Sequence, residues 1–381
     1  MKILHLGDLH LGKRVNEISM IEDQKFILDQ IVTLVKEEKI DVILLCGDIY
    51  DKAIPTIEAI HLLDEFLEEL SDLKVKVLMI SGNHDSSERL SFGRNLFKRS
   101  NLYIASQFNQ EIEKITIKED GYNINFYMLP FVKPAYINHV LKIQTEIYEE
   151  CFKHLMEQVK INEDETNILL AHQFVTVGKN SPELSDSETS SLGGIDNIDY
   201  RLFDAFDYVA LGHIHKPQAM GREMVRYAGS ILKYSFSEIH HKKSVTIVEM
   251  KEKGNVEIST KELAPLRDWC EMKGTYMELT EKEYYENLDQ DSYMHIILTD
   301  EEDIPEAVRK LQVIYPNLMK LDYDNQRTRG KAAFLEAAEA EEKTPFDIFE
   351  ELYEKQNNQE MNEEQKKLIH DLIEKIWEGG H

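Results

Sequence analysis

The chain has 381 residues, 42% of them hydrophobic and 9% aromatic, and this composition excludes a disordered chain or a coiled coil. Its formal net charge of −27 argues against a nucleic-acid partner, because proteins that bind phosphate backbones normally carry a basic surface. No apolar run approaches the roughly 18 residues of a membrane span, so no membrane partner is predicted. The three cysteines are widely spaced, which predicts reduced thiols and a cytoplasmic location.

Short apolar runs alternate with helical patterns in the first two-thirds of the chain. The runs predicted as strands are 2–7, 42–46, 75–80, 168–171 and 208–211, and a helix is predicted over 56–70. This alternation predicts an α/β fold with largely parallel central strands. A second group of segments alternates like antiparallel strands: 114–118, 122–129, 225–228, 244–250 and 256–263. They predict a second sheet, or antiparallel edges to the first.

The last third of the chain has a different pattern. A small α+β unit is predicted, with strands at 276–279, 294–299 and 318–323 and a helix over 305–314. The tail carries two amphipathic helices that follow a charged, Ala/Glu-rich stretch. These changes predict a main domain at 1–265, a capping domain at 266–325, a linker at 326–343 and C-terminal helices at 344–381.

The negative charge is unevenly distributed between these parts. Residues 266–381 contribute −15 of the −27, whereas the longer segment 1–265 contributes only −12. The main domain is therefore only mildly acidic for its length, and its charge does not exclude a phosphate substrate.

Five polar motifs follow predicted strands of the main domain. They are Asp8-x-His10, Gly47-Asp48-x-x-Asp51, Gly82-Asn83-His84-Asp85, His172 and Gly212-His213-x-His215. Because the carboxyl ends of parallel strands lie along one edge of a sheet, these side chains are expected to converge. Each motif alone also fits a loop, a turn or a core histidine. Their combination, in order and at strand ends, predicts a metal site.

Oxygen and imidazole donors without thiolate suit Mn²⁺, Fe²⁺, Zn²⁺ or Mg²⁺ rather than a closed structural zinc site. Seven candidate ligands are too many for one ion but suit two divalent ions that share a bridge. Asp48 is the natural bridging carboxylate, since its motif lies midway in the set. The composition of the motifs thus predicts a two-metal centre.

In this order the motifs resemble the signature of the calcineurin-like metallophosphoesterases. That resemblance implies two sheets packed as an α-β-β-α sandwich, and it leaves phosphatases, small-molecule phosphodiesterases and nucleases open. Three narrower stretches, 2–13, 128–131 and 227–236, resemble the SbcD family of bacterial nucleases. This resemblance covers nearly the whole chain.

The resemblance implies roles for individual residues. One ion would be held by Asp8, His10, Asp48 and His215, and the other by Asp48, Asn83, His172 and His213. His84 would be the catalytic acid at the leaving oxygen. The metal would be manganese. The activity would be 3′→5′ exonuclease on double-stranded DNA ends and endonuclease on hairpins or single strands.

Asp51 stands where archaeal relatives of this family carry a second active-site histidine, and where related phosphatases carry an aspartate. Our hypothesis is that the Asp51 carboxylate pairs with His84 and orients it. The alternative is that Asp51 is a helix-start residue near Pro55.

Basic residues near the motifs are candidate DNA contacts. Lys13 and Arg14 follow the first motif, and Arg89 and Arg94 follow Gly-Asn-His-Asp. For the second pair, a solvated helix face is an equal alternative. The capping domain either narrows the cleft or serves structural support.

The C-terminal helices are candidates for partner binding. Their apolar residues are Phe349, Leu352, Leu368, Ile369, Leu372, Ile376 and Trp377. The family resemblance implies docking on an SbcC-type coiled-coil ATPase, with a homodimer inside a heterotetramer that acts in DNA repair and recombination. Packing of these helices on the chain's own core is the alternative. Two other functions stay open, a phosphatase or small-molecule phosphodiesterase and a non-catalytic scaffold.

Overall fold

The computed structural model describes residues 1–329 except 120, 146, 189–196 and 252, together with 346, 349, 350, 353, 361, 362, 365–369 and 372. The chain divides into two compact units. One comprises residues 1–271 and 291–295, and the other comprises 272–290 and 296–381. All the residues of the predicted metal site lie in the first unit.

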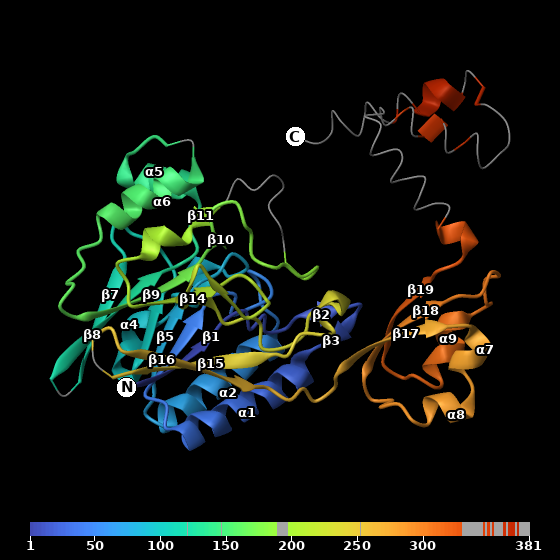
Figure 1. Ribbon diagram of the computed structural model, residues 1–381, viewed down its shortest axis with the longest axis horizontal. Helices are drawn as coiled ribbons and strands as arrows, with labels where there is room; N and C mark the ends of the chain where they lie inside the picture. Colours follow the sequence, from blue (N-terminus) through green and yellow to red (C-terminus); the bar gives the residue numbers. More distant parts are fainter. Residues whose placement is uncertain are drawn as a thin grey trace. The chain divides into compact units, whose positions relative to one another are not determined.

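Two six-stranded sheets form the centre of the first unit (Figure 1). The first has the order β16 (Val256–Glu262), β15 (Ser244–Met250), β1 (Lys2–Leu6), β4 (Val42–Cys46), β5 (Lys76–Ile80) and β6 (Leu102–Ala105). Its strands β1, β4, β5 and β6 are parallel, and β15 and β16 form an antiparallel edge. The predicted strands 244–250 and 256–263 are therefore edges of the first sheet.

The second sheet also has a parallel centre. Its order is β13 (Gln218–Met220), β14 (Arg222–Tyr227), β12 (Tyr208–Gly212), β9 (Thr166–His172), β8 (Tyr122–Leu129) and β7 (Glu113–Glu119). Only the outer pairs β13–β14 and β7–β8 are antiparallel. The antiparallel interpretation of 122–129 and 225–228 is thus only half right, because each strand has one parallel and one antiparallel neighbour.

The core between the sheets explains why the central strands are continuous apolar runs. Val42, Leu44 and Leu78 from the first sheet belong to one buried cluster with Ile168 and Leu170 from the second. A strand that is buried on both faces has no position left for polar alternation. Each fully buried aliphatic side chain stabilises the fold by about 1.5–3 kcal/mol.

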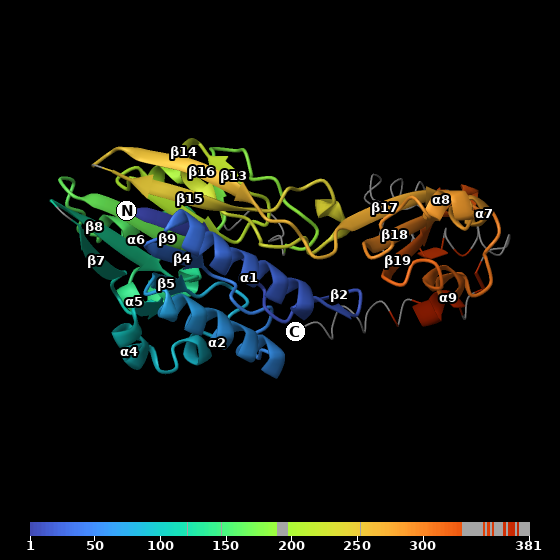
Figure 2. The same ribbon diagram turned by 90° about the horizontal axis from the view of Figure 1, so that it is seen from below.

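Helices cover the outer faces of both sheets. Figure 1 shows α1 (Ile21–Glu38) and α2 (Ile57–Asp72) on one side, and α5 (Pro134–Leu141) and α6 (Tyr148–Glu157) on the other. Figure 2 shows α1 and α2 side by side along the first sheet. The predicted helix at 56–70 is confirmed as α2, and Thr56 caps it by accepting a hydrogen bond from the Ala59 N–H at 3.3 Å. The predicted α-β-β-α sandwich is confirmed.

Short elements connect the sheets and helices. They are β2 (Arg14–Val15), β3 (Ile18–Ser19), α3 (Ser87–Leu90), α4 (Arg94–Phe97), η1 (Lys98–Ser100), β10 (Val175–Thr176), β11 (Ile198–Asp199), η2 (Tyr200–Phe203) and η3 (Phe236–Glu238). Among the described residues, no helix is both long and apolar enough to cross a membrane.

A three-stranded sheet follows the sandwich in the chain, in the order β17 (Trp269–Gly274), β18 (Tyr293–Leu298) and β19 (Leu318–Tyr323). The helices of this region are α7 (Tyr276–Leu279), α8 (Lys282–Tyr285) and α9 (Ala307–Gln312). The strand predicted at 276–279 is wrong. Thr275 accepts from the Glu278 N–H at 3.3 Å while the Glu278 carboxylate accepts from the Thr275 N–H at 2.8 Å, a capping box that starts a helix.

Only parts of the predicted C-terminal helices are described. Residues 365–369 are helical, and the Asn362 and Gln365 side chains accept reciprocal hydrogen bonds from each other's backbone N–H at 2.9 Å. These reciprocal hydrogen bonds form a capping box at the start of the helical residues 365–369.

A buried histidine makes the stability of the sandwich depend on pH. His5 in β1 is fully buried, accepts from the Tyr208 hydroxyl at 2.9 Å and donates to the Leu211 carbonyl at 3.1 Å. Burial lowers its pKa to about 3. Below pH ~6.5 the unfolded chain therefore binds a proton that the folded chain does not, and stability falls by up to about 1.4 kcal/mol per pH unit.

The variant His5→Gln keeps one donor and one acceptor but does not titrate. Between about pH 7 and pH 5, we expect the free energy of unfolding to fall more steeply in the wild type than in His5→Gln. Urea unfolding of both proteins across this range measures the difference. Parallel pH dependences would contradict the buried neutral state of His5.

Candidate metal centre

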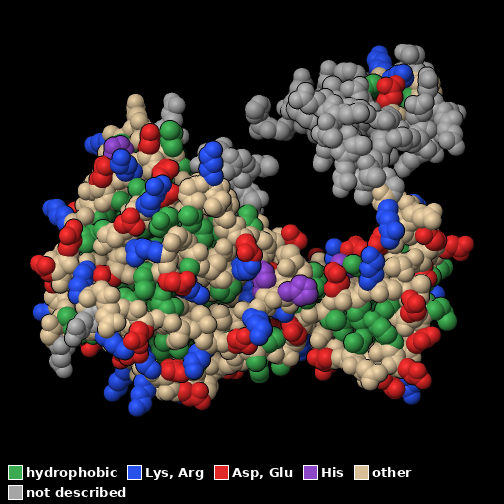
Figure 3. Space-filling view, viewed as in Figure 1, with side chains coloured by type: hydrophobic (Ala, Val, Ile, Leu, Met, Phe, Trp, Pro, Cys, Tyr) green, Lys and Arg blue, Asp and Glu red, His purple; other side chains and the backbone are tan. Residues whose placement is uncertain are grey.

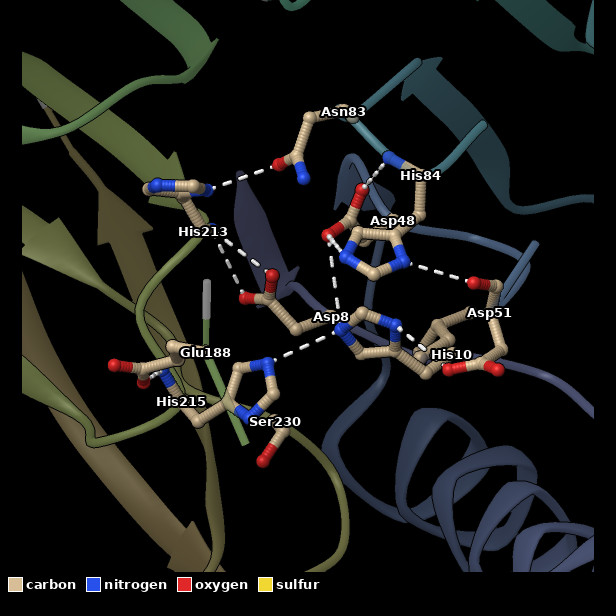
Figure 4. A network of polar contacts seen from close by, with 12 residues as sticks. Asp8, His10, Asp48, Asp51, Asn83, His84, Glu188, His213, His215 and Ser230 are labelled. Atoms are coloured by element: carbon tan, nitrogen blue, oxygen red, sulfur yellow. Dashed lines mark hydrogen bonds and ion pairs between the residues drawn. The ribbon is translucent and has the colours of Figure 1, made fainter. Parts of the chain in front are cut away.

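The sequence-predicted donors come together at one end of the sandwich. Three motifs follow the adjacent strands β1, β4 and β5 of the first sheet, and the other two lie at the ends of β9 and β12 in the second. Figure 4 shows Asp8, His10, Asp48, Asn83, His213 and His215 pointing toward one another. The centre is therefore assembled from both sheets.

Tight backbone turns place the donors at the strand ends. Asp8, His10, Asp48 and His213 all have positive φ, between 45° and 105°. Such a conformation costs a residue other than glycine roughly 1 kcal/mol or more, and it is retained where a site requires it. Gly212 allows the sheets to approach, since a Cβ there would lie 1.9 Å from the Cys46 carbonyl oxygen.

Asp8, His10 and His215 form the first donor group. Their ligand atoms lie within 4.8 Å of one another, and all three side chains are buried. The Nε2 atoms of His10 and His215 are 3.1 Å apart. Two imidazole lone pairs facing each other repel unless a proton or a cation lies between them. The group therefore fits a bound cation.

The second donor group surrounds the Asn83 side chain. Its Oδ1 atom lies 3.0 Å from both His172 Nε2 and His213 Nδ1. His172 Nδ1 donates to the Cys46 carbonyl at 2.8 Å, which leaves Nε2 as the nitrogen that faces the group.

One Asp48 oxygen faces both donor groups. Asp48 Oδ2 is 3.6 Å from His10 Nε2 and 3.4 Å from His172 Nε2. A carboxylate oxygen in this position is suited to bridging two ions.

Burial makes the two carboxylates of the centre strong attractors of positive charge. Burial raises the pKa of Asp8. It also acts to raise the pKa of Asp48, but the nearby imidazoles, His172 foremost, outweigh it and lower that pKa. The pKa of His172 is raised to about 9, because Asp48 and Asp8 outweigh its own burial. A divalent cation supplies the compensating charge that such carboxylates need.

His84 lies at the open side of the centre. Its side chain is 29% exposed, whereas His10, His172 and His215 are buried. Its Nδ1 atom is 2.8 Å from the backbone carbonyl of Asp51, and its Nε2 atom is 4.0 Å from Asp48 Oδ2. The carbonyl can only accept, so the proton sits on Nδ1 and Nε2 faces the centre.

The expected pairing of the Asp51 carboxylate with His84 is wrong. That carboxylate accepts from Lys13 Nζ at 2.8 Å and lies 3.7 Å from His10 Nδ1. The backbone of Asp51, not its side chain, orients His84. Side-chain and backbone acceptors at one residue look the same in a sequence, so the motif alone did not distinguish them.

The variant Asp51→Asn should therefore retain most of the activity. It leaves the carbonyl that holds His84 in place, and the asparagine side chain can still accept a hydrogen bond from Lys13. We expect kcat to fall by less than about tenfold, with an unchanged pH profile. Steady-state cleavage rates across pH, compared with those of His84→Gln, measure this. A shifted pH profile would instead support pairing of the Asp51 carboxylate with His84.

The four basic residues predicted to contact DNA fall into two pairs. Lys13 donates to the Asp51 carboxylate, which lies beside His10, and exposed Arg14 on β2 donates to the Glu17 carbonyl. Arg89 instead donates to the Ala53 carbonyl at 2.6 Å, and Arg94 lies 3.7 Å from Glu113. On the face shown in Figure 3, acidic and basic side chains of the first unit are interspersed.

Sequence reasoning missed several residues that hold the site together. Asp85 accepts from the backbone N–H groups of Ile49, Tyr50 and Gly82 at 2.8–3.1 Å, and so ties two motifs together. The others are Ser187, Glu188, Glu238 and Lys243, which surround His215. The available signal was the position of Asp85 inside a motif; for Glu238 and Lys243 the sequence carries no such signal.

The chain is similar to proteins of known family. Residues 1–217 match the model of the calcineurin-like phosphoesterase family, and residues 262–357 match SbcD_C, described as the type 5 capsule protein repressor C-terminal domain. The chain is 33% identical over 378 residues to the D subunit of nuclease SbcCD from Staphylococcus epidermidis, with 98% of each chain covered. The chain belongs to the SbcD family of calcineurin-like phosphoesterases.

Membership of the SbcD family confirms the resemblance predicted from the sequence motifs, and it identifies the chain as a metal-dependent hydrolase. The crystal structure of TT1561 of Thermus thermophilus is also similar, with a TM-score of 0.39 and 14% identity over 68% of this chain and 98% of that one.

Proposed function

We propose that this chain is the manganese-dependent DNA nuclease component of an SbcCD-type complex. It would act as a 3′→5′ exonuclease on double-stranded ends and as an endonuclease on hairpins and single strands, in DNA repair and recombination. The observation that carries the proposal is the position of Asp48 Oδ2, within 3.6 Å of an imidazole from each donor group. Family membership over 98% of the chain supports it.

The proposed ligands follow the two donor groups. Asp8, His10, Asp48 and His215 would hold one ion, and Asp48, Asn83, His172 and His213 the other. Mixed carboxylate, amide and imidazole donors suit manganese. When bound, two such ions activate water and stabilise charge on the scissile phosphate.

His84 is the proposed general acid. The Asp51 carbonyl holds the Nδ1–H tautomer, so a further proton goes to Nε2, the nitrogen that faces the centre. From there it can be donated to the leaving oxygen.

Lys13 and Arg14 are the proposed phosphate contacts at the rim of the centre. Arg89 and Arg94, which contact Ala53 and Glu113, would have to leave these partners to bind DNA. The bound ions supply positive charge at the cleaved phosphate, so an acidic chain can hydrolyse DNA.

A substrate panel tests the proposed activity. Labelled double-stranded DNA, hairpin DNA, a cyclic nucleotide and p-nitrophenyl phosphate are each incubated with Mn²⁺ and the wild type or His84→Gln. We expect cleavage of DNA by the wild type and almost none by the variant. Turnover of the small esters alone would favour a phosphatase or small-molecule phosphodiesterase instead.

The C-terminal helices are the proposed docking element for an SbcC-type coiled-coil ATPase. Phe349, Leu368 and Leu372 are exposed apolar residues, and Ile369 is half-buried. Leu352, Ile376 and Trp377 lie outside the described residues. Exposed apolar positions on amphipathic helices suit docking into a groove. Loss of co-purification with the ATPase in Leu368→Asp would test this assignment.

A homodimer is proposed through the α2 and α3–α4 face. Ile54 and Phe92 are 72% and 82% exposed, and they line a largely apolar groove of about 860 Å³. Contiguous exposed apolar side chains of this kind mark interfaces. We expect Phe92→Asp to shift the protein from dimer to monomer with its metal affinity unchanged, as measured by light scattering after gel filtration. A variant that stays dimeric would contradict this face as the interface.

We also propose a capping role for residues 266–325, a linker role for 326–343 and a cytoplasmic location. The free state of Cys46, Cys151 and Cys270 supports a reducing compartment.

A further inference from the structure

The segment 183–188 packs beside His215. The Glu183 N–H donates to Gln218 Oε1 at 3.0 Å, and the Asp186 N–H donates to Ser237 Oγ at 2.9 Å. The Glu188 carboxylate accepts from the backbone N–H of His215. Figure 4 shows Glu188 beside His215. This segment belongs to the Ser-rich stretch that begins six residues after His172.

Ser187 connects His215 to a buried ion pair. Its Oγ atom is 2.6 Å from His215 Nδ1 and 2.6 Å from Glu238 Oε1. Glu238 is fully buried, and its other oxygen is 2.5 Å from Lys243 Nζ. Lys243 in turn donates to the carbonyl of His215 at 2.9 Å and to Ser230 Oγ at 2.8 Å.

The direction of these hydrogen bonds is determined by chemistry. Glu238 is ionised in its pair with Lys243, and a carboxylate can only accept. The Ser187 hydroxyl must therefore donate its proton to Glu238, and its oxygen must accept from His215 Nδ1–H. The proton on Nδ1 leaves the Nε2 lone pair directed toward His10 and the first donor group.

We propose that Ser187 and Glu238 are positioning residues for His215, and that metal binding at the first donor group is coupled to docking of residues 183–188. Outer partners of a metal-bound histidine fix its tautomer and ring orientation, and their loss typically weakens metal affinity about 10- to 100-fold. Because linkage is reciprocal, a metal that requires the docked segment also stabilises its docking. This inference rests on the proposed two-metal centre.

The same segment contains a matched control. Ser185 is also buried, and its hydroxyl has no hydrogen-bond partner among the described residues. Ser185→Ala and Ser187→Ala therefore remove the same atom from the same segment, but only the second breaks the connection to His215. Ser187→Thr restores the hydroxyl.

The experiment measures Mn²⁺ binding to the full chain by titration calorimetry. It is performed in an Asn83→Ala background, which removes a donor of the second group and isolates the first. We expect Ser187→Ala to raise the dissociation constant about 10- to 100-fold, with Ser185→Ala within about twofold of the parent and Ser187→Thr close to it. Hydrogen exchange should show Mn²⁺-dependent protection of residues 183–188 in the parent that is lost in Ser187→Ala.

The outcomes separate the two proposals. Equal Mn²⁺ affinity of Ser187→Ala and the parent would overturn the positioning role while leaving the metal centre intact. An equal loss in Ser185→Ala would overturn it too, since the effect would then be general to the segment. Absence of Mn²⁺ binding in the wild type would overturn the proposed function and this inference with it.

Discussion

Replacement of His84 by glutamine should lower Mn²⁺-dependent DNA cleavage by about 10²–10⁴-fold, the usual contribution of a general acid. His84 is 29% exposed, and its Nε2 faces the site while the Asp51 carbonyl holds Nδ1. Glutamine retains a polar side chain of similar reach but cannot donate a proton at the leaving oxygen. We expect the loss in kcat, with KM nearly unchanged.

The matched control is His154→Gln, at an exposed histidine on α6. It should leave activity within about twofold of the wild type. Titration with Mn²⁺ should show two ions bound by His84→Gln, since His84 lies outside the proposed ligand set. Wild-type rates in His84→Gln would remove the general-acid role, and loss of an ion would place His84 among the ligands.

Replacement of Asp48 by asparagine should weaken both metal sites at once. Asparagine has nearly the same shape as aspartate. Its side-chain oxygen can still accept from the backbone N–H of His84, which donates to Asp48 Oδ1 at 2.9 Å. It lacks the charge that attracts both ions. Bound metals contribute several kcal/mol to stabilising the transition state, so we expect cleavage to fall by about 10³-fold or more.

Calorimetric titration with Mn²⁺ measures the affinity part of this prediction. The control is Asp199→Asn, which removes a buried carboxylate on β11 that pairs with Arg201 and belongs to neither donor group. Loss of one ion with undiminished affinity for the other would show that Asp48 does not bridge.

The donor set could be predicted from sequence because topology does most of the placement. Asp8, Asp48 and Asn83 follow neighbouring parallel strands, and such strands end at one edge. The order of the motifs then sufficed to bring them together. The two-sheet sandwich could be predicted for the same reason, since apolar runs without alternation indicate strands that are covered on both faces.

Features that depend on side-chain direction could not be predicted in this way. The sequence Gly47-Asp48-x-x-Asp51 does not show whether the side-chain carboxylate or the backbone carbonyl of Asp51 reaches His84. That depends on the backbone conformation of the turn after β4. Ser187 and Glu238 are 51 residues apart, and their contact arises only when both segments reach His215. The strand predicted at 276–279 failed because two terminal hydrogen bonds of Thr275 and Glu278 outweigh the apolar pattern.

The hydrophobic layer between the sheets also serves as the spacer of the catalytic centre. The donors that follow β1, β4 and β5 are attached to the first sheet, and the histidines at the ends of β9 and β12 are attached to the second. The thickness of the layer therefore sets the distance between these two sets of side chains. Ala210 lies in this layer, two residues before Gly212. A larger side chain there would push the two halves of the centre apart without touching a ligand. The spacing of the active site is therefore determined by residues that perform no chemistry.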